Sequence, residues 1–368
     1  MSPVSGWKIG PSEGSKGEGW TTHQLTQPIT RLEKCTQNCS MLSGVWAEGA
    51  LAEIEFGFIT RDNWVSLMKT CVLLSTYNGE LFIQDQIESI LRQTILPDYL
   101  IVRDDGSSDR TIEIIQSDIK GSEISLQIII GENIGPAKSF MELFHLGVAT
   151  DADVFFFCDQ DDIWEQEKIS VFVSRFNCSP QVPRAVFSQL LLVDEANKPI
   201  LLTIPPRKIG FGNSIIENVM TGCALACNRP LLKLVSERSF DDSPLHDSLI
   251  YIISTMLGTV EYIDTPLTRY RQHGKNVIGY STSTWRSCKS MFVRTWRGKN
   301  YKKSTLAQNI LSSYGDIMQL PDRRTLEMVA RCPQSMILRI KLALSTRLWR
   351  QNTFHGVTWR ALCVFGFF

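Results

Sequence analysis

The feature that most constrains the fold is a repeated alternation of strand-like and helix-like segments over residues 71–176. Four runs are rich in β-branched, aliphatic and aromatic residues: CVLLS (71–75), YLIVR (99–103), LQIII (126–130) and VFFFC (154–158). After each run, apolar side chains recur with helical spacing, over 83–91, 112–119, 136–149 and 169–176. Strands separated by helices of this length form β-α-β units. We therefore predict an α/β protein with a mixed, mainly parallel sheet flanked by helices.

The pattern changes after Ala185. Residues 185–194 (AVFSQLLLVD) and 222–228 (GCALACN) are predicted strands, and 260–274 is predicted to be a short extended segment. Ser243 and Pro244 offer an N-cap and a first-turn proline for a helix through about Leu257. Earlier in the chain, Ser108 or Asp109 is the expected cap of helix 112–119. This half is expected to complete the same sheet.

Three regions divide the 368 residues. Residues 1–67 show little periodicity, and we expect a poorly structured extension or a stretch included by a wrong choice of start codon. Residues 68–284 form the predicted domain, which begins with the strand after Met68. Residues 285–368 form a basic helical tail. The ten cysteines include no CxxC pair and no apolar run is long enough to span a bilayer, so we expect reduced thiols and a cytoplasmic protein.

Charge is distributed unevenly although the net charge is zero. From Trp285 to Phe368 there are 15 Lys and Arg against 3 Asp and Glu, whereas residues 68–284 hold 18 against 28. Such asymmetry favours an anionic partner surface, either a membrane or nucleic acid. Within the tail, 335–350 mixes apolar residues with Arg and Lys, and WRALCVFGFF closes the chain. This composition is typical of helices at an anionic membrane, although a helical hairpin packed on the domain would also account for it. No nucleic-acid-binding motif is present.

Polar clusters follow three of the predicted strands. They are STYNGE (75–80), RDDGSSD (103–109) and DQDD (159–162). Each one alone could be an ordinary turn, since Asn-Gly and Asp-Gly pairs favour turns. In open parallel sheets, however, ligands bind outside the carboxyl ends of the strands. Three clusters at one edge therefore indicate a binding pocket, in which Asp104 and Asp105 could accept the N–H of a pyrimidine.

The DQDD cluster indicates a metal site. Asp159 and Asp161 point to the same side if the backbone stays extended, because strand side chains alternate. Two carboxylates together suit a hard cation such as Mg²⁺ or Mn²⁺. The spacing excludes an EF-hand, because Trp164 and Ser170 stand where that loop needs glycine and glutamate. A cation beside a nucleotide pocket implies a bound diphosphate, which suggests a sugar nucleotide.

Taken together, these motifs resemble a known family. CVLLSTYNGE, RDDGSSD, GENIGPAKSF, FFFCDQDDIW, TGCALAC, LHDSLI and YRQHGKN occur in the order found in family 2 glycosyltransferases of the GT-A fold. The resemblance covers roughly residues 70–280 and is strongest to the rhamnosyltransferase-like branch of bacterial surface-polysaccharide synthesis. It implies a GT-A-type, Rossmann-like sheet and an inverting, metal-dependent glycosyl transfer. The implied partners are a nucleotide-sugar donor, with dTDP-L-rhamnose favoured and UDP-hexoses open, and a glycan or lipid-linked acceptor.

The resemblance also implies roles for single residues. Thr76, Asn78 and Glu80 would line the base and ribose, Asp104 and Asp105 would bind the base, and Asn133 and Lys138 would approach the nucleotide. Asp159 and Asp161 match the DxD pair, which contacts the ribose and the metal-bound diphosphate. Arg271 and His273 match an element that closes over the diphosphate, and His273 is a further expected metal ligand.

On the acceptor side, the resemblance makes Asp247 the catalytic base, with His246 in place of the glutamate found before it in many relatives. Without the surrounding motifs, Asp247 would be interpreted as an acidic residue in the first turn of a helix, where the helix dipole favours negative charge. Gly222 and Trp164 are assigned to the same side, and Trp164 could equally be a core residue. A peripheral position on the inner face of the bacterial membrane follows from the basic tail. The alternatives are a nucleotidyltransferase, whose glycine-rich loop STYNGELF lacks, and a non-catalytic sugar-nucleotide-binding protein.

Overall fold

The computed structural model describes residues 68–176, 180–238, 245–273 and 303–366. The chain separates into two compact units, Met1–Glu55 and Phe56–Phe368, and all described residues belong to the second. No helix among the described residues is both long enough and apolar enough to cross a membrane.

The core of the second unit is one mixed sheet. Its strands are β1 (Thr70–Thr76), β2 (Tyr99–Asp104), β3 (Ser125–Ile130), β4 (Val154–Cys158), β5 (Ile163–Trp164), β6 (Arg184–Val193), β7 (Pro199–Leu202), β8 (Leu225–Asn228) and β9 (Thr259–Arg271). The order is β3-β2-β1-β4-β8-β6-β9-β5, with β7 paired to β6. β1 to β4 are mutually parallel, β8 is antiparallel to both its neighbours, and β6 runs parallel to β9. The predicted mixed and mainly parallel sheet is confirmed.

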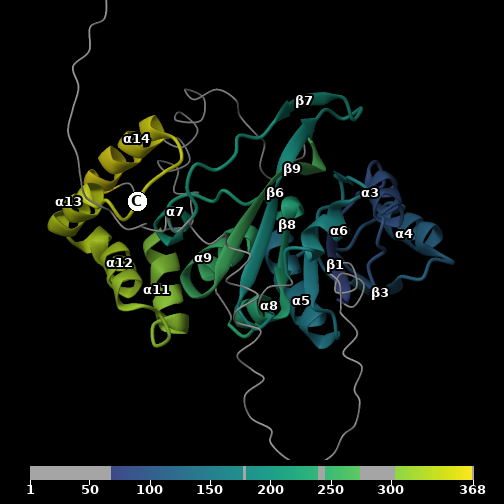
Figure 1. Ribbon diagram of the computed structural model, residues 1–368, viewed down its shortest axis with the longest axis horizontal. Helices are drawn as coiled ribbons and strands as arrows, with labels where there is room; N and C mark the ends of the chain where they lie inside the picture. Colours follow the sequence, from purple (N-terminus) through teal and green to yellow (C-terminus); the bar gives the residue numbers. More distant parts are fainter. Residues whose placement is uncertain (1–67, 177–179, 239–244, 274–302, 367–368) are drawn as a thin grey trace, which may run out of the picture. The chain divides into compact units, whose positions relative to one another are not determined.

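Alternation along the strands divides the core between the two faces of the sheet (Figure 1). Val72 and Leu74 contribute to a cluster with the helices of one face, whereas Cys71 and Leu73 contribute to the cluster on the other. The first face is covered by α3 (Ile83–Leu91), α4 (Thr111–Ile119) and α6 (Lys168–Val173). The second is covered by α5 (Pro136–Ala149), α8 (Arg229–Ser236) and α9 (His246–Leu257). The predicted central helices are therefore present.

The C-terminal region is helical, as expected. It comprises α11 (Lys303–Tyr314), α12 (Leu320–Arg331), α13 (Met336–Leu344) and α14 (Thr353–Val364). Their buried side chains belong to the same hydrophobic cluster as α5 and α9, and Tyr314 donates its hydroxyl to the carbonyl of Leu234 at 2.8 Å. The short helix α7 (Phe211–Ser214) is bonded to the segment before α14, because Asn213 Nδ2 donates to the carbonyl of Trp349 at 3.1 Å. The basic helices thus pack against the sheet domain.

Two predicted strands differ from the structure. Residues Gly222–Ala224 form a 3₁₀ turn, and β8 begins only at Leu225. The carbonyl of Cys223 accepts a hydrogen bond from the ammonium of Lys168 at 2.6 Å. A side chain thus bonds this carbonyl in place of the backbone of a neighbouring strand. The expected short segment after residue 259 is instead the long strand β9, which pairs with β6 through a bulge near Gln189.

Two predicted helix starts also differ or fall outside the described residues. Helix α4 has Arg110 at its N-cap without a side-chain cap, and Asp109 accepts from the amide of Thr111 at 3.1 Å instead. Helix α9 begins at His246 and ends at Leu257 as expected. The proposed cap residues Ser243 and Pro244 lie outside the described residues, as do residues 1–67.

A glycine in α7 tests whether the C-terminal helices are part of the folded core. A Cβ at Gly212 would overlap the carbonyl oxygen of Arg347 and press on the ring of Trp349. Gly212→Ala is therefore expected to lower the free energy of unfolding by about 1–3 kcal/mol, measured by urea denaturation. Gly356→Ala in α14 is the matched control, since no atom lies within 4 Å of its Cβ position. It is expected to be neutral or stabilising by up to about 1 kcal/mol. Equal stability of Gly212→Ala and wild type would contradict this packing.

Candidate active site

A cavity of about 640 Å³ lies at the carboxyl ends of the parallel strands, in the size range of ligand pockets. Residues following β1, β2 and β4 line one part of it, and residues 218–222 with the start of α9 line the other. Ten of the predicted site residues line it: Thr76, Asn78, Asp105, Asn133, Asp159, Asp161, Gly222, His246, Asp247 and His273. Five predicted residues do not: Glu80, Asp104, Lys138, Trp164 and Arg271.

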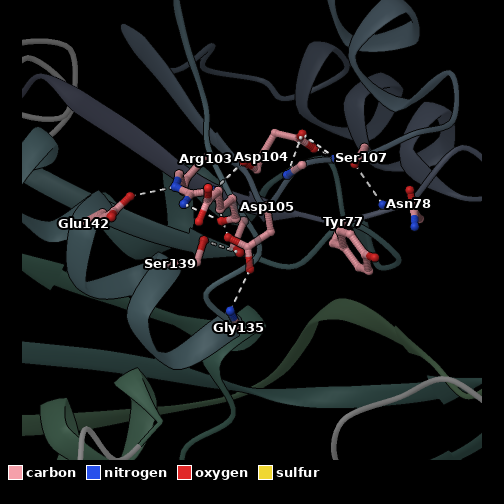
Figure 2. Close-up of polar contacts among 12 residues, drawn as sticks. Tyr77, Asn78, Arg103, Asp104, Asp105, Ser107, Gly135, Ser139 and Glu142 are labelled. Atoms are coloured by element: carbon pink, nitrogen blue, oxygen red, sulfur yellow. Dashed lines mark hydrogen bonds and ion pairs between the residues drawn. The ribbon is translucent and has the colours of Figure 1, made fainter. Parts of the chain in front are cut away.

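The loop after β2 is held by Asp104, whose carboxylate points into the loop (Figure 2). Its Oδ2 accepts from the amides of Gly106 and Ser107 at 3.1 and 2.8 Å, and the side chain is almost fully buried. This bonding fixes the loop opposite Asn78, which adopts a left-handed conformation with φ 46° and donates its amide to Ser107 Oγ at 2.8 Å. Asp104 is therefore a support for the pocket wall, and the expectation that it binds the base directly is corrected.

Asp105 is the carboxylate of this pair that reaches the cavity. Its Oδ1 forms a buried ion pair with Arg103 at 2.8 Å, and its Oδ2 accepts from the amide of Gly135 at 2.9 Å (Figure 2). Arg103 also bonds Glu142 at 2.6 Å, so the guanidinium is held from two sides. Charge-assisted bonds of this kind fix an acceptor in one orientation. Asp105 thus presents a fixed carboxylate to the cavity next to the end of β2.

Tyr77 is a cavity residue that the sequence interpretation missed. Its side chain is 47% exposed although it lines the cavity beside Asn78 (Figure 2). An exposed aromatic ring on a pocket wall is a platform on which a base can stack. The available signal was the tyrosine inside STYNGE, an apolar residue within an otherwise polar strand-end cluster.

Glu80 and Lys138 lie outside the cavity. Glu80 Oε2 accepts from the amide of Arg110 at 3.2 Å, and its own amide donates to Asp109 Oδ2 at 3.1 Å. These bonds join the loop after β1 to the start of α4. Lys138 is exposed on the first turn of α5. The expected direct contacts of both side chains with the nucleotide are therefore not supported by their placement.

The end of β4 carries concentrated negative charge. Asp159 lines the cavity, and burial together with the neighbouring Asp161 and Asp247 raises its pKa to about 7. Asp161 Oδ2 lies 2.6 Å from His273 Nε2, and the His273 ring stacks on Phe82. Burial first, and then the two neighbouring carboxylates, disfavour the charged form of Asp159.

Asp162 points into the protein. It is fully buried, and burial with the neighbouring carboxylates holds its pKa well above the ordinary range. Its Oδ1 accepts from the amide of Arg271 at 3.1 Å. Below the cluster, the buried ammonium of Lys168 lies 3.6 Å from the centre of the Trp164 ring, and its pKa is lowered to about 8 by burial. A buried cation therefore offsets part of the acidic charge from inside.

One group of possible metal-ligating atoms is drawn together in the described part of the chain. It consists of Asp159, Asp162 and Cys223, whose ligand atoms lie within 4.8 Å of one another. The predicted set of Asp159, Asp161 and His273 is not drawn together in this way. Burial holds the pKa of the Cys223 thiol well above its ordinary value, so this sulfur is a poor ligand for a hard cation. Asp159 is common to both sets, and its unneutralised charge fits a divalent cation.

Trp164 and Arg271 serve the framework in this structure. Trp164 is 3% exposed and packs on Phe156 within the core, which corrects its assignment to an acceptor surface. The Arg271 guanidinium donates to the carbonyls of Asp161 and Glu195 at 2.9 and 2.6 Å and pairs with Asp85 at 2.6 Å. Arg271 thereby anchors the loop that carries Asp161, and its placement does not show the expected contact with a diphosphate.

The N-terminus of α9 brings Asp247 and His246 to the same cavity. Asp247 is 7% exposed, and burial raises its pKa to about 6 although its Oδ1 accepts from the amide of Ser248 at 2.6 Å. Its charge also acts on Asp159. Burial lowers the pKa of the neighbouring His246 to about 3, and its ring stacks on Phe140 at 3.7 Å between centroids.

The charged side chains that line the cavity are predominantly acidic. Four carboxylates line it, from Asp105, Asp159, Asp161 and Asp247, and within the described ranges no Lys or Arg side chain does. A carboxylate of raised pKa beside an open cavity can act as a general base. A cation that bound together with an anionic ligand would offset the repulsion between that ligand and these carboxylates.

Comparison with known proteins identifies the domain. Residues 71–182 match the family model described as Glycosyl transferase family 2. This segment runs from β1 to just before β6 and contains Asp105, Asp159 and Asp161.

Curated relatives carry related descriptions. The chain is 26% identical over 226 residues to dTDP-rhamnosyl transferase RfbG of Shigella flexneri, covering 57% of this chain and 75% of the relative. An uncharacterized glycosyltransferase, alr2836 of Nostoc sp., is 27% identical over 57% of this chain and 66% of its own length, just under two thirds. O-antigen chain rhamnosyltransferase RfbN of Salmonella typhimurium is 34% identical over 96 residues, which are 26% of this chain and 29% of that protein.

Among solved structures, S. aureus TarS 1–349 in complex with UDP-GlcNAc matches 75% of this chain and 84% of its own, with 16% identity and a TM-score of 0.46. Mannosyltransferase PcManGT from Pyrobaculum calidifontis, in complex with GDP-Man and Mn²⁺, matches 90% and 81%, with 15% identity and a TM-score of 0.46. Structural likeness at this level does not identify a function. The family match and the named relatives do: this chain carries a glycosyltransferase family 2 domain and is a glycosyltransferase with rhamnosyltransferase relatives.

Proposed function

We propose that this protein transfers a sugar from a nucleotide-sugar donor to a hydroxyl of a growing polysaccharide or lipid-linked glycan, with inversion at the anomeric carbon. The observation that carries the proposal is that Asp247 lines the same cavity as the carboxylates at the end of β4 and that its charge acts on Asp159. One cavity thus offers a base for the acceptor hydroxyl and carboxylates for a cation that binds an anionic leaving group. These are the two groups that a single displacement needs.

Asp247 is the proposed catalytic base. It takes the proton of the acceptor hydroxyl as that oxygen forms its bond to the anomeric carbon, and the bond from this carbon to the diphosphate oxygen breaks. The electron pair of the broken bond leaves with the diphosphate. A pKa of about 6 makes Asp247 a stronger base than an ordinary carboxylate while it stays ionised at neutral pH. Burial therefore suits this side chain to the role.

A divalent cation, Mg²⁺ or Mn²⁺, is the proposed cofactor, held by Asp159 and Asp161 with His273 nearby. The fit rests on the carboxylate oxygens of Asp159 and Asp161 at the cavity and on the neighbouring carboxylates, which repel the charged form of Asp159 and which a bound cation would offset. When bound, such an ion stabilises the negative charge that develops on the departing diphosphate. Asp161 would have to exchange its bond with His273 for a bond to the ion.

The proposed donor is dTDP-L-rhamnose, and a UDP-hexose is the alternative. The names of two relatives, a dTDP-rhamnosyl transferase and an O-antigen chain rhamnosyltransferase, favour rhamnose. At the nucleotide end, Asp105 and Asn133 offer polar contacts, and Tyr77 offers a face for stacking on a base. Both pyrimidine nucleotides fit this arrangement, so the choice between them needs a binding measurement.

Donor and metal binding can be tested by thermal shift. Addition of dTDP-L-rhamnose with Mn²⁺ is expected to raise the melting temperature, since a ligand that binds only the folded state stabilises it. Asp159→Asn should lose the metal-dependent part of the shift. Asp247→Asn should keep the shift and lose sugar transfer by at least about 100-fold, the scale of general-base catalysis. A shift with UDP-glucose alone would discard rhamnose, and no shift with any sugar nucleotide would refute the proposal.

The raised pKa of Asp247 also makes the free energy of unfolding depend on pH. The pKa of Asp247 is about 6 in the folded protein against an ordinary 3.8, so the folded state binds more protons than the unfolded state between these values. The free energy of unfolding therefore falls as pH rises from about 4 to about 6. Asp247→Asn removes this loss and should be more stable than wild type at pH 7, by on the order of 2–3 kcal/mol. Urea denaturation from pH 4 to 7.5 measures the difference, which should shrink towards pH 4; a pH-independent difference would contradict it.

We further propose that the C-terminal helices rest on the inner face of the bacterial membrane, near a lipid-linked acceptor. On α13, the side chains of Met336, Ile337, Ile340 and Leu344 are 40–75% exposed and fall on one side of the helix. Phe354, Val357 and Phe365 form a similar exposed row along α14 and its end. From Arg331 to the C-terminus there is no Asp or Glu. Apolar rows beside basic groups suit an anionic bilayer surface.

Vesicle flotation tests the membrane contact. The wild-type protein should float with vesicles rich in phosphatidylglycerol and much less with phosphatidylcholine alone. The double variant Ile337→Glu, Leu344→Glu should lose binding, because both exposed side chains would place a carboxylate against an anionic surface. Ile200→Glu on β7, where the side chain is 54% exposed, is the matched control and should float like wild type. Equal flotation of the double variant would refute this surface.

A further inference from the structure

His246 is an unusual member of the cavity wall. The side chain is 6% exposed, and neither Nδ1 nor Nε2 has a hydrogen-bond partner among the described residues. Other buried side chains with an unpartnered nitrogen or oxygen occur in the described part, but His246 is the one among them that lines the cavity. A buried polar atom without a partner costs about 1–3 kcal/mol. A bound ligand that supplied the partner would recover that cost.

Aromatic packing holds the His246 ring in place. The ring stacks on Phe140 with 3.7 Å between centroids and lies 5.5 Å from the ring of Phe157. Both phenylalanines are buried, and Phe140 itself lines the cavity. The imidazole is therefore positioned before any ligand arrives, which is the property of a recognition group.

Gly222 lets the His246 ring pack against the backbone of residue 222. A Cβ at Gly222 would overlap Nε2 of His246, and both residues line the cavity. The φ of Gly222 is not in the left-handed region, so the close contact with the ring, and not the backbone conformation, requires glycine here. Because the ring itself borders the cavity, a ligand group there could approach a ring nitrogen to about 2.7–3.2 Å, the separation between heavy atoms that a hydrogen bond needs.

The charge state of the His246 ring determines which kind of ligand group it can bind. Burial lowers the pKa of His246 to about 3, so the imidazole is neutral, with one nitrogen that donates and one that accepts. A neutral ring is a weak partner for a diphosphate but matches a hydroxyl, which both donates and accepts. Gly222 is followed by Cys223, whose Sγ lies within 4.8 Å of the carboxylates of Asp159 and Asp162. The His246 ring, which contacts Gly222, is therefore next to the end of the cavity proposed for the diphosphate, which carries the donor sugar.

We propose that His246 and Gly222 form a specificity subsite that hydrogen-bonds one ring hydroxyl of the donor sugar. This inference rests on the proposed function and moves both residues from the acceptor side to the donor. Asp247, the next residue, then lies beside the sugar whose anomeric carbon reacts. The subsite contacts the sugar of the donor and makes no contact with the nucleotide.

Calorimetric titration with paired ligands tests the subsite in the full-length protein with Mn²⁺. The pairs are dTDP-L-rhamnose with dTDP, and UDP-glucose with UDP. His246→Phe keeps the ring on Phe140 and removes both nitrogens. It should weaken binding of the nucleotide sugar about 10-fold, the value of one hydrogen bond, and leave binding of the free nucleotide unchanged. His145→Phe, exposed on α5, is the matched control and should change neither.

Two further variants separate recognition from a purely structural role. His246→Gln retains a donor and an acceptor and should bind the nucleotide sugar better than His246→Phe. Gly222→Ala would displace the His246 ring and should weaken sugar binding even if His246→Phe fails to fold. Without ligand, His246→Phe should melt at a higher temperature than wild type because two unpartnered nitrogens are gone, whereas a structural histidine would give a lower one.

The outcomes are distinct. If wild type binds a nucleotide sugar and both His246→Phe and Gly222→Ala bind it equally well, the subsite is refuted and the proposed function stands. If wild type binds neither nucleotide sugar, the proposed function and the subsite both fall. A loss that extends equally to free dTDP or UDP would also refute the subsite, because the variant would then have disturbed the nucleotide end.

Discussion

A lysine buried beneath the acidic cluster makes the active site compatible with a folded sheet. The ammonium of Lys168 is inaccessible to solvent, donates to the carbonyl of Cys223, lies over the Trp164 ring and is attracted to Asp162 and Asp159. Isolated charges of either sign are costly in such surroundings, and opposite charges offset part of that cost. Helix α6, which directly follows the cluster, thus supplies the cation that lets β4 end in carboxylates.

Lys168 offsets the charge of the acidic cluster from the protein interior and not from the cavity. Lys168 faces the interior side of the cluster, and the Arg271 guanidinium is engaged by Asp85 and backbone carbonyls. The carboxylates of Asp159 and Asp247 are left to the cavity, where burial and mutual repulsion raise the pKa of Asp159. Cations of the described framework therefore stabilise the fold, while the cavity keeps a negative potential that a metal-bound diphosphate would relieve.

Periodicity predicted the sheet and the central helices, and strand-end polarity predicted part of the cavity lining, because both follow from local patterns along the chain. The resemblance to the family supplied Asn133, Gly222, His246, Asp247 and His273. The structure differs from the prediction where residues distant in the sequence determine the placement of a side chain. Adjacent Asp104 and Asp105 look alike in sequence, yet one bonds its own loop and the other reaches the cavity beside Arg103. Trp164 is covered by Lys168 from the next helix, and Arg271 is bound by a side chain far away in the chain. No local signal specifies such partners.

The position of β8 has a consequence for how chains of this kind can diversify. β8 lies between β4 and β6, so it joins the segment that matches the family model to the later strands. Asp105 and Asp159 come from before residue 182, whereas His246 and Asp247 come from after it. Two consecutive stretches of the chain thus both contribute to one cavity, and His273 from the later stretch bonds Asp161 from the earlier one. Recombination near residue 182 would therefore have to preserve this contact as well as the pairing of Phe155 and Phe156 with β8. Outside these contacts, selection can act on the two stretches separately.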